Sequence, residues 1–399
     1  MATRKAAARC GRTAAIGACV GALVAGCGAA AQRAPASRAA HATVSSRTAP
    51  AAPASSHEFA ELIDLSPRLG LVGLGTGPQV GGSARLVASS DFGRSFTAIS
   101  PRTAAWTVTD DVFFLNRMDG WFAVFNVNTL RETLYRTRDG GHSWQGFSAP
   151  SHNLAAGAAD TVQFLTPSEG WLTQTMPTAP REGLFLTRDG GRSWHLMASA
   201  PLGQLPALGP VEFEPGGRTG WLGGGMFSNA LYRTSDQGRT WHRAAIPTPA
   251  GSWFALPALL GSTLLEPVVT GSPRELRLYR STDGGARWSL VSTLPAVAVR
   301  PGTCGPATPP ASFPSRTVAW AAAAHGRRTV VYRSTDQGRH WTTIKVPGTT
   351  PADTCQAPQL QALDATHAWL LDGGSGRIYA TSNGGKTWRR IDTAALAAG

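Results

Sequence analysis

Short apolar stretches recur along the chain, and each runs directly into a polar turn. Their β-branched and aromatic side chains are typical of strands, as in Leu134–Thr137, Leu231–Thr234 and Val331–Ser334. The turns share the pattern Ser/Thr-x-Asp-x-Gly-x-x-Trp. It occurs seven times, with its central residue at Asp91, Asp139, Asp189, Asp236, Asp283, Asp336 and Asn383. The intervals between these residues are 47 to 53 residues, which indicates one repeated structural unit.

The residue types of this pattern are those of a tight turn. Asp and Asn accept hydrogen bonds from backbone N–H groups two residues further on, and Gly supplies the positive φ that a hairpin needs. The Trp can then pack back across the hairpin. Two copies depart from the pattern, because Phe96 replaces Trp in the first and Asn383 replaces Asp in the last. We therefore expect each copy to join the last two strands of its unit.

A second repeated element lies 14 to 18 residues before the central Asp or Asn. It is a small residue followed by Trp, as Trp121, Trp171, Trp221, Trp320 and Trp369. We expect each unit of about 48 residues to hold four strands, a to d, with this Trp at the a–b turn or at the start of strand b. Units of this size, repeated four to eight times, are typical of a β-propeller. The sequence predicts an all-β, seven-bladed β-propeller of four-stranded blades over residues 58–396.

The first 57 residues differ from the repeats in composition. Four basic residues, Arg4, Lys5, Arg9 and Arg12, precede an apolar run over 14–24, which is too short to span a bilayer. Residues 1–26 are predicted to be an export signal, and 27–57, rich in Ala, Pro and Ser, a flexible tether. The stretch 24–27, Val-Ala-Gly-Cys, resembles a bacterial lipobox, which implies lipidation of Cys27. An ordinary signal peptide cut after another small residue is the alternative.

The seven repeats resemble BNR, or Asp-box, repeats. These occur in sialidases, sortilin-type receptors, xyloglucan-cleaving hydrolases and photosystem II stability/assembly factor-like propellers. One propeller behind a lipoprotein signal is most similar to the last group, whose members bind partner proteins. The resemblance implies a binding or scaffold lipoprotein at the extracytoplasmic face of the cell membrane. It would be a monomer without a cofactor or metal, and an enzyme activity is not expected.

Sialidase activity is disfavoured, because that family needs a Tyr nucleophile. All five Tyr of this chain lie four residues before the central Asp or Asn of a repeat. A different glycoside hydrolase remains an alternative, since four carboxyl groups lie near predicted strand-a starts: Asp110, Asp111, Asp160 and Glu212. Two carboxylates facing the channel could perform acid/base chemistry, or they could be polar lining residues without a catalytic role.

Partner-binding candidates are expected on the face opposite the Asp turns. Trp106 and Trp253 fall in loops that lead from strand d of one blade to strand a of the next. They are either exposed anchors for a partner or plugs at the start of an inner strand. Six arginines stand 6 to 9 residues before the central Asp or Asn: Arg85, Arg131, Arg181, Arg274, Arg328 and Arg377. They would form a partial ring suited to an acidic protein or an anionic glycan, or they are solvated strand ends.

Cysteine placement and net charge complete the prediction. Cys304 and Cys355 lie in successive d–a loops, and a disulfide between them would close a 51-residue loop in an oxidising compartment. Such a bond stabilises by about 4 kcal/mol in the chain-entropy model. The net charge is +13, of which residues 1–57 supply +7. More than half of the excess thus belongs to export and tethering, and nucleic acid is not an expected partner of an exported protein.

Overall fold

The computed structural model divides the chain into two units, 1–56 and 57–399. It describes residues 59–391 of the second unit, except 64–71, 78–84, 90, 105–106, 127, 130, 151–160, 175–182, 198–207, 225–229, 272–274, 296–310, 326–327, 350–357 and 373–376. Several predicted residues lie outside the described residues: Cys27, Trp106, Asp160, Arg181, Arg274, Cys304 and Cys355. For Arg85, Asp110 and Arg328 only the backbone is described.

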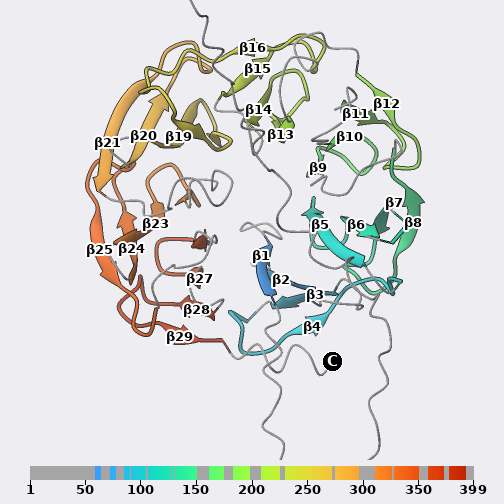
Figure 1. Cartoon of the computed structure of the whole chain (residues 1–399), viewed down its shortest axis with the longest axis horizontal. Coiled ribbons are helices and arrows are strands. Elements are labelled where there is room, and N and C mark those ends of the chain that lie inside the picture. The colour runs from blue at the N-terminus through green and yellow to red at the C-terminus, as the bar shows by residue number, and fades with distance from the viewer. Residues whose placement is uncertain are drawn as a thin grey trace, which may run out of the picture. The chain divides into compact units, whose positions relative to one another are not determined.

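The described residues form seven antiparallel sheets and contain no helix (Figure 1). Each sheet is built from consecutive strands, so the chain completes one sheet before it begins the next. Sheet 1 contains β1 (Phe59–Ile63), β2 (Val72–Gly77), β3 (Arg85–Ser89) and β4 (Thr97–Ala98). Sheet 2 contains β5 (Thr107–Phe114), β6 (Gly120–Asn126), β7 (Arg131–Thr137) and β8 (Gln145–Ser148). Sheet 3 contains β9 (Thr161–Phe164), β10 (Gly170–Gln174), β11 (Gly183–Thr187) and β12 (His195–Leu196).

The remaining four sheets follow the same order. Sheet 4 contains β13 (Leu208–Phe213), β14 (Gly220–Gly224), β15 (Tyr232–Thr234) and β16 (His242–Arg243). Sheet 5 contains β17 (Trp253–Phe254), β18 (Ala258–Leu260), β19 (Thr263–Val269), β20 (Glu275–Ser281) and β21 (Ser289–Pro295). Sheet 6 contains β22 (Ala311–Ser312), β23 (Ala319–His325), β24 (Arg328–Ser334) and β25 (Thr342–Lys345). Sheet 7 contains β26 (Gln359–Ala362), β27 (Ala368–Asp372), β28 (Arg377–Thr381) and β29 (Arg389–Arg390). No segment of the described chain has the helical length and hydropathy of a membrane span.

The strand order agrees with the predicted a–b–c–d unit. In sheet 2, Trp121 is the second residue of β6, and Asp139 lies in the turn between β7 and β8. Sheet 5 differs, because β17 and β18 both pair with β19 and together replace a single first strand. Pro257 lies between them, and a proline cannot donate a ladder hydrogen bond. The interruption of this first strand therefore has a local cause.

The hydrophobic core lies between the sheets. Seven clusters of buried side chains each join two sheets that follow one another in the chain, and one of them joins sheet 7 to sheet 1. In that last cluster Val87 of sheet 1 packs with Trp369 and Ile391 of sheet 7. The sheets thus follow one another around a closed circle, in which every sheet is packed on both faces (Figure 1).

The Gly-Trp pairs occupy one recurrent position in this packing. Trp121 stacks on Phe164 of the next sheet, with ring centroids 3.6 Å apart, and Trp171 stacks on Phe213 at 4.0 Å. The glycine before the Trp has a different neighbour. A Cβ at Gly120 would come within 2.5 Å of the Phe114 ring in its own sheet. A small residue is therefore needed beside the Trp for the close packing of a protein interior.

Candidate functional site

The seven Asp or Asn turns share one hydrogen-bond arrangement. In the turn of sheet 2, Thr137 Oγ1 donates to Asp139 Oδ1 at 2.8 Å and accepts from the Gly141 N–H at 2.8 Å. The Ser143 N–H also donates to Asp139 Oδ1, at 2.8 Å, and the Ser143 hydroxyl donates to Oδ2. The hydrogen bonds from Ser143 lower the pKa of Asp139 to about 2. The carboxylate therefore organises its own turn.

The turn also depends on a glycine that touches the preceding sheet. Gly141 has a φ of 94°, which side chains rarely adopt. A Cβ at this position would come within 2.7 Å of Ile99 Cβ, at the end of sheet 1. The glycine thus meets both a backbone requirement and a packing requirement.

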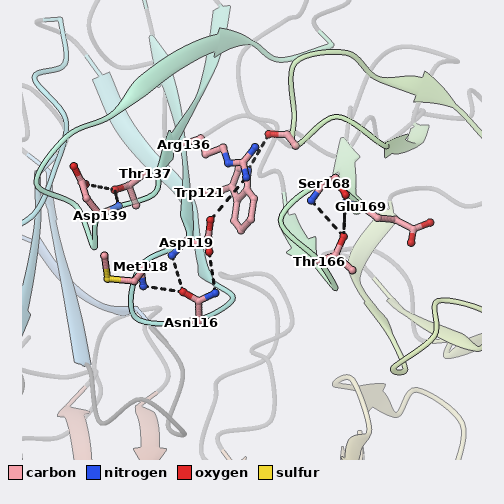
Figure 2. A network of polar contacts seen from close by, with 11 residues as sticks. Asn116, Met118, Asp119, Trp121, Arg136, Thr137, Asp139, Thr166, Ser168 and Glu169 are labelled. Atoms are coloured by element: carbon pink, nitrogen blue, oxygen red, sulfur yellow. Dashed lines mark hydrogen bonds and ion pairs between the residues drawn. The ribbon is translucent and has the colours of Figure 1, made fainter.

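The a–b turns lie beside the c–d turns of the same sheets. The Gly140 N–H donates to the Met118 carbonyl at 3.0 Å, and the Gly190 N–H donates to the Ser168 carbonyl at 2.9 Å. Sheets 4, 6 and 7 repeat this bond, through Gln237 to Arg218, Gln337 to Thr317 and Gly384 to Thr366. We call the surface formed by the a–b and c–d turns the turn face. Figure 2 shows part of it, where Asn116 Oδ1 accepts from the Met118 and Asp119 N–H groups at 2.8 Å.

A second arginine series ties neighbouring sheets together on this face. Arg136, Arg233 and Arg333 lie opposite the strand-b Trp of their own sheets, with Cζ 5.2 to 5.8 Å from the ring centroids. Arg333 also reaches the next sheet and donates to the Ala365 and Gly384 carbonyls at 3.1 and 3.2 Å. Arg280 in sheet 5 donates to Gln337 Oε1 at 3.3 Å. Sequence reasoning gave these residues no role, although each stands between the repeat Tyr and the Ser/Thr.

At the junction between sheets 7 and 1, the arginine that bonds to the neighbouring sheet comes from the fourth strand of sheet 7 and not from the third. Ala380 occupies the place of the arginine, and Arg389 is its partner across the strand pair. Arg389 donates to the carbonyls of Phe92 and Gly93, at 2.7 and 3.2 Å. Phe92 in turn stacks on His367, with centroids 4.1 Å apart. The first and last sheets are therefore held by side-chain contacts, and every described strand pairs only within its own sheet.

The opposite surface holds the d–a segments and the starts of the c strands, and we call it the loop face. Arg131 and Arg377 are the first residues of β7 and β28, and both side chains are exposed. Arg85 and Arg328 begin β3 and β24 at the same position. Arg131 and Arg377 belong to sheets 2 and 7, so sheet 1 separates them. A continuous arginine ring stays a prediction, because two of the six residues lie outside the described ones.

A groove of about 430 Å³ opens on the loop face between sheets 4 and 5. It is lined by Leu231, Arg243, the segment 244–246, and residues 248–252 with Phe254. Strand β16 ends at Arg243, and the d–a segment that follows it supplies most of the lining. Ile246 and Phe254 pack against the buried cluster that contains Trp221 and Tyr279. Apolar side chains and one arginine, Arg243, are thus among the residues that line the groove, which sequence reasoning did not predict.

Trp253 lies next to this groove but is itself part of a core. It is half-buried in β17 and packs against the cluster of Val269, Leu276 and Tyr332 between sheets 5 and 6. This packing agrees with the alternative given above, in which Trp253 plugs the start of an inner strand. Its role as a partner anchor stays a prediction.

The channel-side carboxyl candidates have contacts within the fold. Asp111 Oδ2 accepts from the Val162 N–H of the next sheet at 2.6 Å. Gln163 makes an equivalent bridge to the Phe213 N–H and carbonyl, at 2.6 and 3.1 Å. Glu212 is half-buried in β13. Bridges of this kind join the first strands of neighbouring sheets, a role that the sequence analysis did not anticipate for these polar residues.

Glu266 is a buried carboxyl group that the sequence analysis did not single out. It is fully buried in β19 and accepts the Ala255 N–H at 3.0 Å. Burial raises its pKa well above the usual value for a glutamate. Within the described residues, no three His, Cys, Asp or Glu side chains are grouped so that they could hold a metal ion.

Comparison with known proteins adds evidence on the fold. No family model matches the chain, and no curated protein matches it by sequence. Among solved structures it is similar to the GH74 xyloglucanase from Xanthomonas campestris, with a TM-score of 0.60, 17% identity and coverage of 84% of this chain. The match covers 55% of the xyloglucanase, so this chain spans about half of that enzyme's length.

Two structures of YCF48 are also similar. One is YCF48 bound to D1 peptide, with a TM-score of 0.52, 13% identity and coverage of 82% of this chain and 94% of that one. The other is YCF48 from Cyanidioschyzon merolae, with a TM-score of 0.52, 14% identity and coverage of 83% and 97%. At these identities the likeness concerns the fold alone. Together with the seven antiparallel sheets, it shows that this chain has a β-propeller-like fold.

Proposed function

We propose that this chain is an exported, lipid-anchored, seven-bladed Asp-box propeller that binds a protein partner through its loop face. The observation that carries the proposal is the groove between sheets 4 and 5, about 430 Å³ in volume. Its floor is apolar and continuous with a buried cluster, and Arg243 supplies a charged group at its wall. Such a combination of apolar surface and a few polar groups is typical of binding sites.

The contrast between the two faces supports this assignment. On the turn face, the recurrent pattern of each repeat is used for hydrogen bonds within the protein, as in the Asp139 turn. On the loop face, Arg131 and Arg377 are exposed, and the groove is open. Functional residues in general are found on loops that a rigid scaffold positions. A fold shared with YCF48, which has been solved with a bound peptide, is compatible with peptide recognition but does not identify the partner.

The anchoring part of the proposal rests on the sequence. Cys27 follows a basic segment and a short apolar run, and residues 28–56 suit a tether about 30 Å in root-mean-square length. Two or more acyl chains give stable membrane attachment. The partner would therefore be an extracytoplasmic protein, or an anionic glycan of the envelope.

The glycoside hydrolase alternative has less support. Its fold-level basis is the likeness to the xyloglucanase, at 17% identity. Asp111, one of the candidate carboxylates, already accepts a hydrogen bond from the next sheet. An Asp111→Asn variant assayed on a glycan panel tests this alternative, which requires turnover by the native chain and none by the variant.

Site-specific photo-crosslinking tests the binding proposal. A crosslinking amino acid at Ala245, which is exposed and lines the groove, should give a discrete adduct in membranes that contain the full chain. The same amino acid at Ala286, exposed in a turn of sheet 5, is the matched control and should not give that adduct. Arg131→Glu with Arg377→Glu should lower the yield at Ala245 if the two arginines belong to the same surface. The same adducts from positions 245 and 286 would contradict the proposal.

A further inference from the structure

Exposed basic side chains project from the turn face at one position of the repeat. The residue after the turn glycine is cationic in five of the seven turns: Arg94, Arg192, Arg239, Arg339 and Lys386. All five are exposed. The backbone N–H groups of Arg94, Arg192 and Arg339 donate to the turn aspartates at 3.0 to 3.1 Å. The turn thus fixes where each cation leaves the backbone.

The carboxylates of the c–d turns on this face accept hydrogen bonds within the protein. Asp91, for example, accepts from the Arg94 and Ser95 N–H groups and from the hydroxyls of Ser89 and Ser95. In the a–b turns, Asp119 pairs with Arg136 at 3.8 Å, and Asp364 pairs with His367 at 2.8 Å. In contrast, none of the five repeat cations forms an ion pair with another described residue. Five exposed cations of the face thus lack an ion-pair partner among the described residues.

Several arginines gather where sheets 2 and 3 meet. Arg138 and Arg188 are exposed in the two neighbouring turns, beside Arg192. Burial is the main cause that lowers the pKa of the Arg136 guanidinium, and the charges of Arg138 and Arg192 lower it further. These three groups therefore lie near one another. Met118 lies in the adjoining a–b turn, with 53% of its surface exposed (Figure 2). Exposed arginines together with an exposed apolar side chain suit the interface of a bilayer.

The repeat places these cations at one level. In sheets 2, 3, 4, 6 and 7 the c–d turn is bonded to the a–b turn of its own sheet, and Arg333 and Arg389 join turns of neighbouring sheets. A closed circle of equivalent turns presents its tips in one plane, and a planar target can meet all of them at once. We propose that the turn face docks on a membrane surface that contains anionic phospholipid. This inference is independent of partner binding at the loop face.

Vesicle binding tests the inference with charge-matched variants. The full chain carries Cys27→Ser, so that no acyl chain contributes to binding. It is mixed with phosphatidylcholine vesicles that contain about 30% phosphatidylglycerol, and with control vesicles of pure phosphatidylcholine. Arg94→Gln with Arg339→Gln should weaken the partition coefficient by about tenfold at 0.1 M salt. The control, Arg102→Gln with Lys345→Gln, removes the same charge from exposed residues outside the turn face. It should weaken the partition coefficient by about twofold at most. Melting curves verify that both variants fold.

Three results would overturn the inference. Equal binding to phosphatidylglycerol-containing and pure phosphatidylcholine vesicles would show that the turn face does not recognise anionic lipid. Equal losses in the two double variants would mean that net charge acts without regard to the face. Binding to a soluble polyanion such as polyphosphate, but not to vesicles, would assign the face to a polymer. Crosslinking at Ala245 reports on the loop face separately, so failure of one proposal does not imply failure of the other.

Discussion

The turn face and the loop face of this protein are built by the same repeat and have opposite properties. On the turn face, each recurrent residue has an identified neighbour: Asp139 binds its own turn, Gly141 touches Ile99, and Trp121 stacks on Phe164. On the loop face the segments differ from sheet to sheet, and one of them leaves a groove. The difference teaches that the repeat pattern encodes contacts within the fold, and we propose that binding specificity resides where the repeat is irregular. The predictions below test that separation.

The largest loss of stability should come from the stacked tryptophans. Trp121 is fully buried and packs between sheets 2 and 3. Replacing it with Ala removes a large apolar surface and leaves a cavity, so the free energy of unfolding should fall by about 3–5 kcal/mol. Denaturant unfolding measures the change. A loss below about 1 kcal/mol would mean that the junction can collapse around the smaller side chain.

The turn glycine should come next. Gly141→Ala places a Cβ at a φ of 94° and within 2.7 Å of Ile99. The two penalties, backbone strain and crowding, should together cost about 2–3 kcal/mol. Gly251→Ala is the matched control, since Gly251 also has a positive φ, of 74°, but nothing lies within 4 Å of the added Cβ. A control that is as destabilised as Gly141→Ala would show that the contact with Ile99 is unimportant.

Removal of a single inter-sheet arginine should have a smaller effect. Arg333→Ala and Arg389→Ala each delete two hydrogen bonds to backbone carbonyls of the next sheet. We expect about 1–2 kcal/mol from each, and hydrogen exchange should increase at the affected junction alone. Arg390→Ala, at an exposed position of the same strand as Arg389, should leave stability within about 0.5 kcal/mol of the native value. Unchanged exchange in Arg389→Ala would contradict its role between sheets 7 and 1.

The turn carboxylates predict an acid-sensitive contribution to stability. The pKa of Asp139 is lowered to about 2 in the folded protein, chiefly by the Ser143 hydroxyl, against about 3.9 unfolded. The stabilisation is therefore present above the unfolded pKa and is lost as the pH falls through the folded pKa near 2. Asn383 shows that an amide can take this place, because its Oδ1 accepts the Thr387 N–H at 2.9 Å. Asp139→Asn should thus reduce the drop in melting temperature between pH 4 and pH 2, and an unchanged drop would contradict the assignment.

The sequence was informative about the turn face and much less so about the loop face. Seven turns, the four-strand order of six of the seven sheets and the place of Trp121 follow from local chemistry that recurs every 47 to 53 residues. The arginine ties were missed because the interaction joins different sheets, although Arg136 and Arg333 stand at a fixed position beside the repeat Tyr. The groove depends on where the chain leaves β16 and how it crosses Phe254, which no periodic signal records.

The double contrast between Ala245→Trp and Thr137→Val tests the central claim most directly. Ala245 is exposed in the groove, whereas Thr137 is buried and binds both Asp139 and Gly141. Partner capture by the full chain is measured with equal amounts of folded protein, using a crosslinker at Arg131. The account predicts that Ala245→Trp keeps the native melting temperature but loses the adduct, and that Thr137→Val lowers the melting temperature but keeps it. An adduct that survives Ala245→Trp and disappears with Thr137→Val would contradict the account.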